Sequence, residues 1–152
     1  MLKAIIFDFN RTLYDPDQGR LFDGVAPLLQ SFRALGLKQG LVSFGGAEKE
    51  KLIRGLGLDK MVESYVVVAE KTPAIFLSFA DRFKVRPEET LVVGDLVNQE
   101  VALGQSLGMT GVWLKAGKFA GEVPSVQPDF TIAHVAELEP IVKQRLGIGT
   151  RE

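Results

Sequence analysis

Short, almost purely apolar runs alternate along the chain with longer segments in which apolar residues recur every three or four positions. A run that is apolar throughout predicts a strand buried on both faces, as in a parallel sheet covered by helices. The recurring positions predict amphipathic helices. The predicted strands are 2–8, 40–43, 65–69, 90–95, 110–114 and 130–133, and the predicted helices are 25–35, a helix opened by Gly45-Gly46, 72–83, 97–107 and 135–146.

This alternation predicts an α/β fold. Strands separated by helices of such length imply right-handed crossovers, and hence a Rossmann-like, doubly wound parallel sheet in three α/β/α layers. The segment 14–22, which contains Pro16 and Gly19, predicts a small hairpin or flap after the first strand. We find no repeat and no linker that would divide the chain, so we predict a single domain over residues 1–152.

Composition narrows the classes of function. The 152 residues, 46% of them hydrophobic, can form one core without disulfides or a structural metal. The chain has no cysteine, which excludes thiolate sites and is typical of a reducing cytosol. A net charge of −1 does not indicate binding to nucleic acid. No apolar run approaches the roughly 18 residues of a membrane span. No signal-peptide pattern is present, so we expect a cytoplasmic protein.

Two predicted strands, the first and the fourth, end on the carboxylates Asp8 and Asp95. A carboxylate directly after a buried run loses hydration unless a metal, a cation or N–H groups compensate for it. In doubly wound sheets, ligands bind beyond the carboxyl ends of the strands, where the strand order reverses. One such Asp alone is typical of a helix N-cap. The presence of two favours a functional site.

The polar residues at these strand ends form four motifs. They are Asp8-Phe-Asn10-Arg-Thr12, Leu41-Val-Ser43, Lys71, and Gly94-Asp95 with Glu100. Their order resembles that of the haloacid dehalogenase-like hydrolases, and the resemblance covers nearly the whole chain. Most members of that family are Mg-dependent phosphatases or phosphotransferases. The resemblance therefore implies phosphoryl transfer, which needs an in-line nucleophile, neutralised phosphate oxygens and a proton for the leaving group.

The resemblance implies catalytic roles for residues of two motifs. Asp8 would be the nucleophile that forms an aspartyl-phosphate, since its carboxylate is already ionised at neutral pH. Lys71 would balance the charge of Asp8 and of the phosphate. The segment Lys71-Thr-Pro73 is one residue shorter than the family pattern, so Glu70 competes for this position. We choose Lys71 because Glu70 cannot supply a positive charge.

The same resemblance implies a metal site. Mg²⁺ prefers hard oxygen ligands in an octahedron completed by water. Asp8, Asp95 and the backbone carbonyl of Asn10 would supply three ligands. Glu100, on the helix after the fourth strand, matches an acidic position that binds the metal directly or through water. Its alternative interpretation is a solvated helix carboxylate.

The phosphate itself would be bound by Thr12, Ser43, the N–H of Phe44, and Lys71. Ser43 ends the second strand, where its hydroxyl and the following N–H groups can face an anion at a helix start. Taken alone, Ser43 is typical of a helix N-cap, and the two roles are compatible.

Asn10 departs from the family pattern, which has a second Asp at this position. That Asp protonates the leaving oxygen and later activates water, and Asn can do neither. Loss of a general acid–base typically costs about 10² to 10⁴ in rate. Three explanations remain open: a specialist for good leaving groups, a degenerate phosphate binder, and an engineered substitution. Arg11, where Gly is commoner, favours a natural variant.

The second departure is the absence of a cap domain. Relatives carry one between the first and second motifs or between the second and third. Here those gaps hold only the flap, two helices and a strand. We therefore expect an open crevice bordered by segment 14–22. Such a crevice admits a bulky or macromolecular phosphorylated substrate, or is covered by a second copy of the chain.

The resemblance therefore implies an Mg-dependent phosphohydrolase of phosphomonoesters or acyl phosphates, and Asn10 predicts that its activity is weakened or selective. The alternative is a non-catalytic phosphate-binding or regulatory module on the same fold. A two-component receiver domain also gathers Asp and Lys over a parallel sheet, but its phospho-acceptor would end the third strand, and segment 65–69 ends without one. We interpret His134 and Trp113 as structural.

Overall fold

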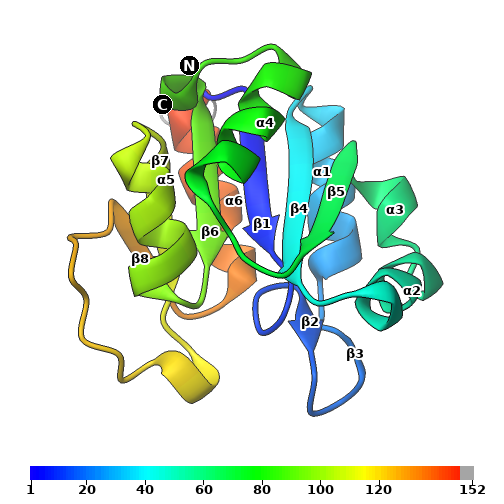
Figure 1. Cartoon of the computed structure of the whole chain (residues 1–152). Helices are drawn as coiled ribbons and strands as arrows, with labels where there is room; N and C mark the ends of the chain where they lie inside the picture. Colours follow the sequence, from blue (N-terminus) through cyan, green and yellow to red (C-terminus); the bar gives the residue numbers. More distant parts are fainter. Residues whose placement is uncertain (148–152) are drawn as a thin grey trace.

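A six-stranded sheet in the order β5-β4-β1-β6-β7-β8 forms the centre of the molecule (Figure 1). Each strand of this sheet pairs in parallel with its neighbours. The computed structural model describes residues 1–147, and residues 148–152, which the single-domain prediction included, lie outside the described part. The strands are β1 (Ala4–Asp8), β4 (Lys38–Phe44), β5 (Ser64–Val68), β6 (Thr90–Gly94), β7 (Thr110–Leu114) and β8 (Phe130–Ile132).

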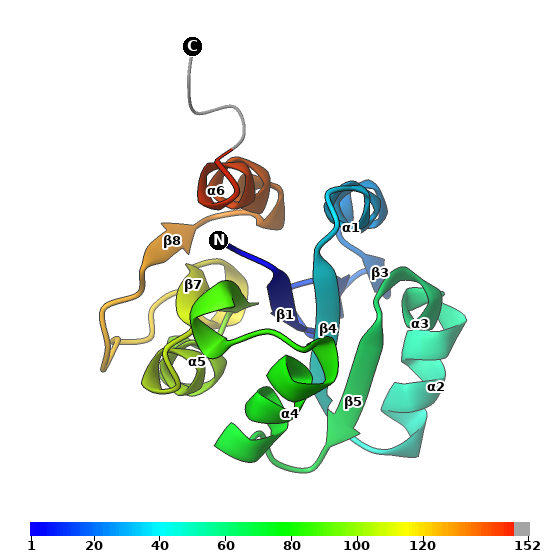
Figure 2. The ribbon, with the colours of Figure 1, turned by 90° about the horizontal axis from the view of Figure 1, so that it is seen from above.

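Helices cover both faces of the sheet (Figure 2), which confirms the predicted three-layer, doubly wound fold. One face carries α1 and α6, the other carries α4 and α5, and α2 and α3 lie near the β5 edge. The helices are α1 (Val25–Ala34), α2 (Ala47–Gly55), α3 (Leu58–Met61), α4 (Pro73–Phe83), α5 (Ala102–Ser106) and α6 (Leu138–Arg145). Single turns are η1 (Pro87–Glu89), η2 (Val97–Val101), η3 (Gly117–Phe119) and η4 (Val135–Glu137).

Alternation along β1 decides which face Asp8 joins. Ile5 and Phe7 belong to the core cluster under α1 and α6, whereas Ile6 belongs to the cluster under α4. Because successive side chains of a strand point to opposite faces, Asp8 falls on the face of Ile6. The segment before α4 and the turn after β6 lie above this same face. The fold therefore brings those two segments to Asp8.

The strand order reverses at β1. From β1 the chain builds outward through β4 and β5 on one side, and then returns to build β6, β7 and β8 on the other. β1 pairs directly with β4 and β6, so their carboxyl ends lie together. This is the switch point at which doubly wound sheets bind ligands, and it brings the ends of the strands that lead to Asp8 and Asp95 together.

The predicted flap is a hairpin of β2 (Tyr14–Asp15) and β3 (Arg20–Leu21). Between β1 and β4 the chain adds only this hairpin and α1, and between β4 and Lys71 it adds α2, α3 and β5. Residues 1–147 thus contain no separate cap domain over the sheet. None of the helices in this part of the chain combines the length and apolar character that a membrane span requires.

Two elements differ from the sequence prediction. The short helix α3 follows α2 directly and was not expected, and its Leu58 is buried in the main core. The helix predicted over 97–107 begins instead as one turn of π-helix, η2, and becomes α-helical only at Ala102. A π-turn holds one more residue than an α-turn and is frequent at functional sites.

Candidate active site

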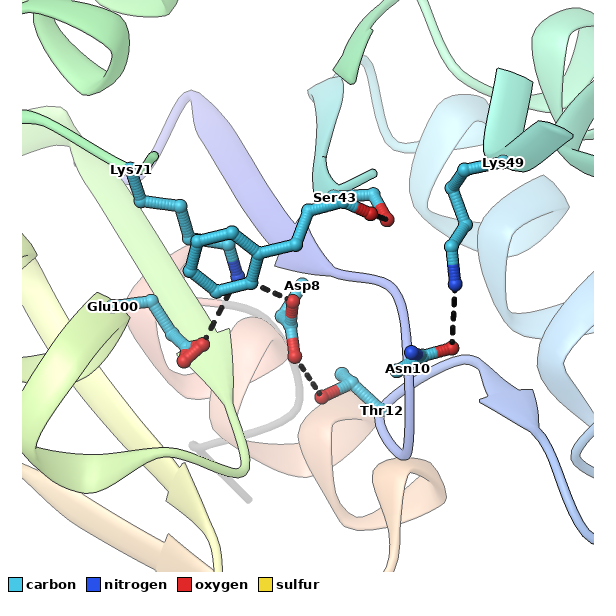
Figure 3. A network of polar contacts seen from close by, with 8 residues as sticks. Asp8, Asn10, Thr12, Ser43, Lys49, Lys71 and Glu100 are labelled. Carbon is cyan, nitrogen blue, oxygen red and sulfur yellow. Dashed lines mark hydrogen bonds and ion pairs between the residues drawn. The ribbon is translucent and has the colours of Figure 1, made fainter. Parts of the chain in front are cut away.

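Asp8 lies in a buried ion-paired cluster at the end of β1 (Figure 3). The Lys71 ammonium is 2.5 Å from Asp8 Oδ1 and 3.2 Å from Glu100 Oε1. The side chains of Lys71 and Glu100 are 2% and 0% exposed, so both contacts are shielded from water. Lys71, rather than the exposed Glu70, is therefore the residue that contacts Asp8.

Asp95 completes this cluster from the end of β6. Asp8, Asp95 and Glu100 each have a carboxylate oxygen within 4.8 Å of those of the other two. Asp95 Oδ2 and Glu100 Oε2 are buried and have no hydrogen-bond partner among the described residues. With Lys71 included, the fully ionised cluster carries two excess negative charges. Such a cluster is suited to a divalent cation, because an uncompensated buried charge is costly.

Gly94 leaves the space through which Glu100 reaches the cluster. A Cβ atom on Gly94 would lie 2.3 Å from Glu100 Cγ and 2.6 Å from Cδ. The Glu100 side chain therefore lies across the end of β6 in space that only glycine leaves free. Glu100 is fully buried, so its interpretation as a solvated helix carboxylate is wrong.

Burial and mutual repulsion change the acidity of the cluster. Burial, and then the charge of Asp8, raise the pKa of Asp95 to about 7. The same two causes raise the pKa of Glu100 to about 8, against the opposing charge of Lys71. Burial lowers the pKa of Lys71, but Asp8 and Glu100 raise it by more, so its net pKa lies above the usual value and the ammonium stays protonated.

The residues present fit Mg²⁺. This cation prefers a set of oxygen donors with negative charge. The cluster offers two carboxylate oxygens without hydrogen-bond partners and two excess negative charges. Oxygens that share a Mg²⁺ lie at most about 4.2 Å apart. The three carboxylate oxygens lie within 4.8 Å of one another, which is close to the spacing that one ion requires. Asp8, Asp95 and Glu100 would hold the ion, and the carbonyl of Asn10 stays a predicted further ligand.

Asn10 lies beside Asp8 in a different setting. Its Oδ1 accepts a hydrogen bond of 3.4 Å from Lys49 Nζ, which reaches over from α2. The Lys49 ammonium also lies 5.3 Å from the centroid of the Phe9 ring. Figure 3 shows Lys71 and Lys49 approaching the loop after β1 from opposite sides.

Arg11 adopts the left-handed backbone conformation, with φ of 63°. Only glycine tolerates this region without strain, which explains why Gly is commoner here. The Arg11 N–H donates to the Tyr14 carbonyl at 2.8 Å, and the guanidinium lies 5.6 Å from the centroid of the Phe119 ring. These contacts hold a tight turn that carries Asn10 past Asp8.

The predicted phosphate-binding residues surround Asp8 unequally. Thr12 Oγ1 donates to Asp8 Oδ2 at 3.5 Å. Ser43 Oγ donates instead to the Phe44 carbonyl at 3.0 Å, so phosphate binding would require this hydroxyl to turn. The Phe44 ring is 4.7 Å from the Lys71 ammonium and covers it. Ser43 is not a helix cap, because α2 begins after Gly46 without a side-chain cap.

The expected open crevice is only partly present. No lid domain covers the site within residues 1–147, yet Asp8 is only 5% exposed. The reason is that Lys71 occupies the space above its carboxylate. A cavity of about 430 Å³, lined in part by Phe44, Lys71 and Asn98, opens next to this lysine. A second of about 330 Å³ lies between the hairpin and residues 116–118.

Sequence reasoning missed three contributors to the site. Trp113, interpreted from sequence only as structural, donates from Nε1 to the Asp95 carbonyl at 3.1 Å and thereby anchors the end of β6. Lys49 and Gly94 were assigned no separate role. No short-range pattern marks Trp113 or Lys49, because each contacts a residue on another strand end. His134 is structural as predicted, since its Nδ1 accepts from Ala136 N–H at the start of η4.

Two curated proteins with similar sequences carry the name of a phosphatase. The chain is 34% identical over 133 residues to glyceraldehyde 3-phosphate phosphatase from Methanopyrus kandleri, covering 81% of this chain and 57% of the relative. It is 33% identical over 122 residues to the protein of that name from Methanocaldococcus jannaschii, covering 76% and 53%. The chain thus spans about half the length of the curated relatives it matches.

Solved structures share the fold. A HAD phosphatase from Thermococcus onnurineus superposes with a TM-score of 0.80 at 20% identity, over 93% of this chain and 98% of that one. A 2-haloacid dehalogenase from Pseudomonas syringae pv. tomato gives 0.78 at 18% identity, over 95% and 100%. A family model described as haloacid dehalogenase-like hydrolase matches residues 14–108, which is most of the chain. With its four motifs gathered at one switch point, this protein belongs to the haloacid dehalogenase-like hydrolases.

Proposed function

We propose that this protein is an Mg²⁺-dependent phosphohydrolase that acts through a phosphorylated Asp8. The observation that carries the proposal is the contact of one buried lysine with both Asp8 and Glu100, beside two orphaned carboxylate oxygens. Burying three carboxylates with a single cation is costly for a core. The arrangement is explained if a divalent cation and a phosphate complete it.

In the first step, an oxygen of Asp8 attacks phosphorus while the bond to the leaving oxygen breaks and its electron pair departs with that oxygen. Lys71 keeps the attacking carboxylate in place and neutralises charge on the phosphate oxygens. Bound Mg²⁺ supplies further positive charge to the phosphate. The product of this step is an acyl phosphate on Asp8.

In the second step, water attacks phosphorus, the bond to Asp8 breaks, and the protons of the water remain with phosphate and solvent. Asn10 can neither protonate the first leaving group nor take a proton from this water. Turnover therefore favours leaving groups that depart as weak bases, such as carboxylates and phenolates. We propose acyl and aryl phosphates as the substrates that are turned over fastest, with slow release of phosphate from Asp8.

The relatives' name supplies a matched pair of test substrates. Glyceraldehyde 3-phosphate is an alkyl phosphate with a strongly basic leaving group, whereas acetyl phosphate has a weakly basic one. With Mg²⁺ present, we expect turnover of acetyl phosphate, a burst of product, and a hydroxylamine-sensitive phosphoryl group on Asp8 by mass spectrometry. Asp8→Asn should abolish all three. If the protein shows no phosphorylated Asp8 and turns over neither compound, the proposed phosphohydrolase function is wrong.

Asn10 also favours a second candidate, a non-catalytic phosphate-binding or regulatory module. Such a module would bind inorganic phosphate with Mg²⁺ in calorimetry and give neither burst nor turnover. We further propose a cytoplasmic location, in keeping with the absence of cysteine. With no cap domain in residues 1–147, a bulky phosphorylated substrate or a second copy of the chain can approach the site.

A further inference from the structure

Lys49 fixes the orientation of the Asn10 amide. An ammonium group only donates hydrogen bonds, so the 3.4 Å contact must be made to the amide oxygen. Figure 3 shows Asn10 Oδ1 turned to Lys49 and Nδ2 turned toward the side of Asp8. The end of the amide that faces Asp8 is therefore the end that donates.

Helix stability does not explain the place of Lys49. It is the third residue of α2, in a first turn where the helix dipole favours acidic residues such as the neighbouring Glu48 and Glu50. Within the described residues it forms no ion pair. A Cβ atom on Gly45 would lie 2.6 Å from Lys49 Cβ, so Gly45 leaves the space in which the lysine stem packs. The lysine is thus directed to Asn10.

We propose that Lys49 is a positioning residue for the leaving group: it holds Asn10 Nδ2 as a donor to the departing oxygen and adds a positive charge behind it. This inference rests on the proposed function and deepens it. The departing oxygen leaves with the electron pair of the broken bond and remains an oxyanion, which the amide N–H and the nearby charge stabilise without transferring a proton. The substrate class is a phosphate whose leaving group is stable as an anion.

The test measures kcat/KM for a series of aryl phosphates whose phenols differ in pKa. Without Lys49, kcat/KM should fall more for substrates with poor leaving groups than for substrates with good ones. We expect Lys49→Gln to cost about tenfold for the most acidic phenol and about 10²-fold for the least acidic. Lys49→Arg should restore the wild-type slope. Lys51→Gln removes the same charge from an exposed position of the same helix and is the matched control.

Each outcome decides the inference. A steeper slope in Lys49→Gln, with an unchanged Tm and with rescue by arginine, supports it. An equal loss for every phenol, no loss, or a rise in KM limited to substrates with an additional anionic group overturns it in an active enzyme. A wild-type chain with no turnover and no phosphorylated Asp8 overturns the proposed function and this inference together, so the two failures are distinguishable.

Discussion

The two lysines near Asp8 lie in opposite environments. Lys71 is 2% exposed and bridges two carboxylates, whereas Lys49 is half-buried and contacts a neutral amide. The first lysine offsets buried charge and so belongs to the stability of the fold as well as to the site. The second offsets none. One side of Asp8 is therefore constrained by electrostatics, while the other can vary at little cost to folding.

We expect the largest difference between the two lysines when each is removed in turn. Lys71→Met leaves buried carboxylates unpaired, so at pH 8 without metal we expect the free energy of unfolding to fall by about 3–5 kcal/mol. Lys49→Met should change it by about 0.5 kcal/mol or less. Urea denaturation of the two variants measures both values. Equal losses would show that the two lysines do not differ in this way.

Mg²⁺ should act on the side of Asp8 formed by Lys71, Asp95 and Glu100, which we call the Lys71 side. At a concentration of 100 times its Kd, a ligand that binds only the folded state adds about 2.7 kcal/mol of stability. We expect a rise in Tm on this scale for the wild type and none for Asp95→Asn. Glu70→Gln removes an exposed carboxylate next to Lys71 and is the control that should keep the full gain. If Glu70→Gln also lost the rise in Tm, the ion would bind outside the cluster of Asp8, Asp95 and Glu100.

Asn10→Asp alters the other side of Asp8, formed by Asn10 and Lys49, which we call the Lys49 side. By restoring a group that can donate a proton, it should raise kcat/KM for an alkyl phosphate about 10²-fold and leave acetyl phosphate nearly unchanged. Because Lys49 stabilises an ionised carboxylate beside it, the gain should be larger when Lys49→Gln is combined with it. Stopped-flow assays of phosphate release measure these rates. If the variant gains nothing on any ester, Asn10 does not limit this protein.

The raised pKa values of Asp95 and Glu100 predict a pH dependence. Between their usual values of 3.8 and 4.5 and their folded-state values of about 7 and about 8, the folded protein binds more protons than the unfolded chain. Stability of the metal-free protein should therefore fall as pH rises through this window. Mg²⁺ requires the ionised forms, so its affinity should rise over the same window. Tm measured against pH, with and without Mg²⁺, tests both slopes.

The smallest effect concerns Trp113, whose indole N–H is bonded to the Asp95 carbonyl. Trp113→Phe keeps an aromatic ring and removes one buried hydrogen bond, so we expect a loss of about 1 kcal/mol. Because the carboxylate of Asp95 is then held less firmly, Mg²⁺ affinity should also fall, by about tenfold. Calorimetric titration measures this. An unchanged affinity would mean that β6 alone positions Asp95.

Much of the Lys71 side was predictable from sequence. Continuous apolar runs gave the strands, and the carboxylates that end two of them marked the switch point, because the fold brings the ends of β1 and β6 together. The Lys49 side was not predictable. Lys49 and Asn10 are 39 residues apart, and neither stands in a pattern that requires the other. The π-turn was also missed, since one additional residue barely changes the apolar spacing of residues 97–107.

The central place of β1 predicts how the two sides differ in hydrogen exchange. Backbone amides of β1, bonded within the middle of the sheet, are expected to exchange with deuterium only when the whole domain unfolds. The hairpin that follows has strands of two residues, so its amides should exchange through local opening. Asn10 stands between these regions. Asp8, the proposed nucleophile, is therefore expected in the slowest-exchanging part of the molecule, while Asn10, the proposed donor to the leaving oxygen, adjoins a part that should open many times before the domain unfolds.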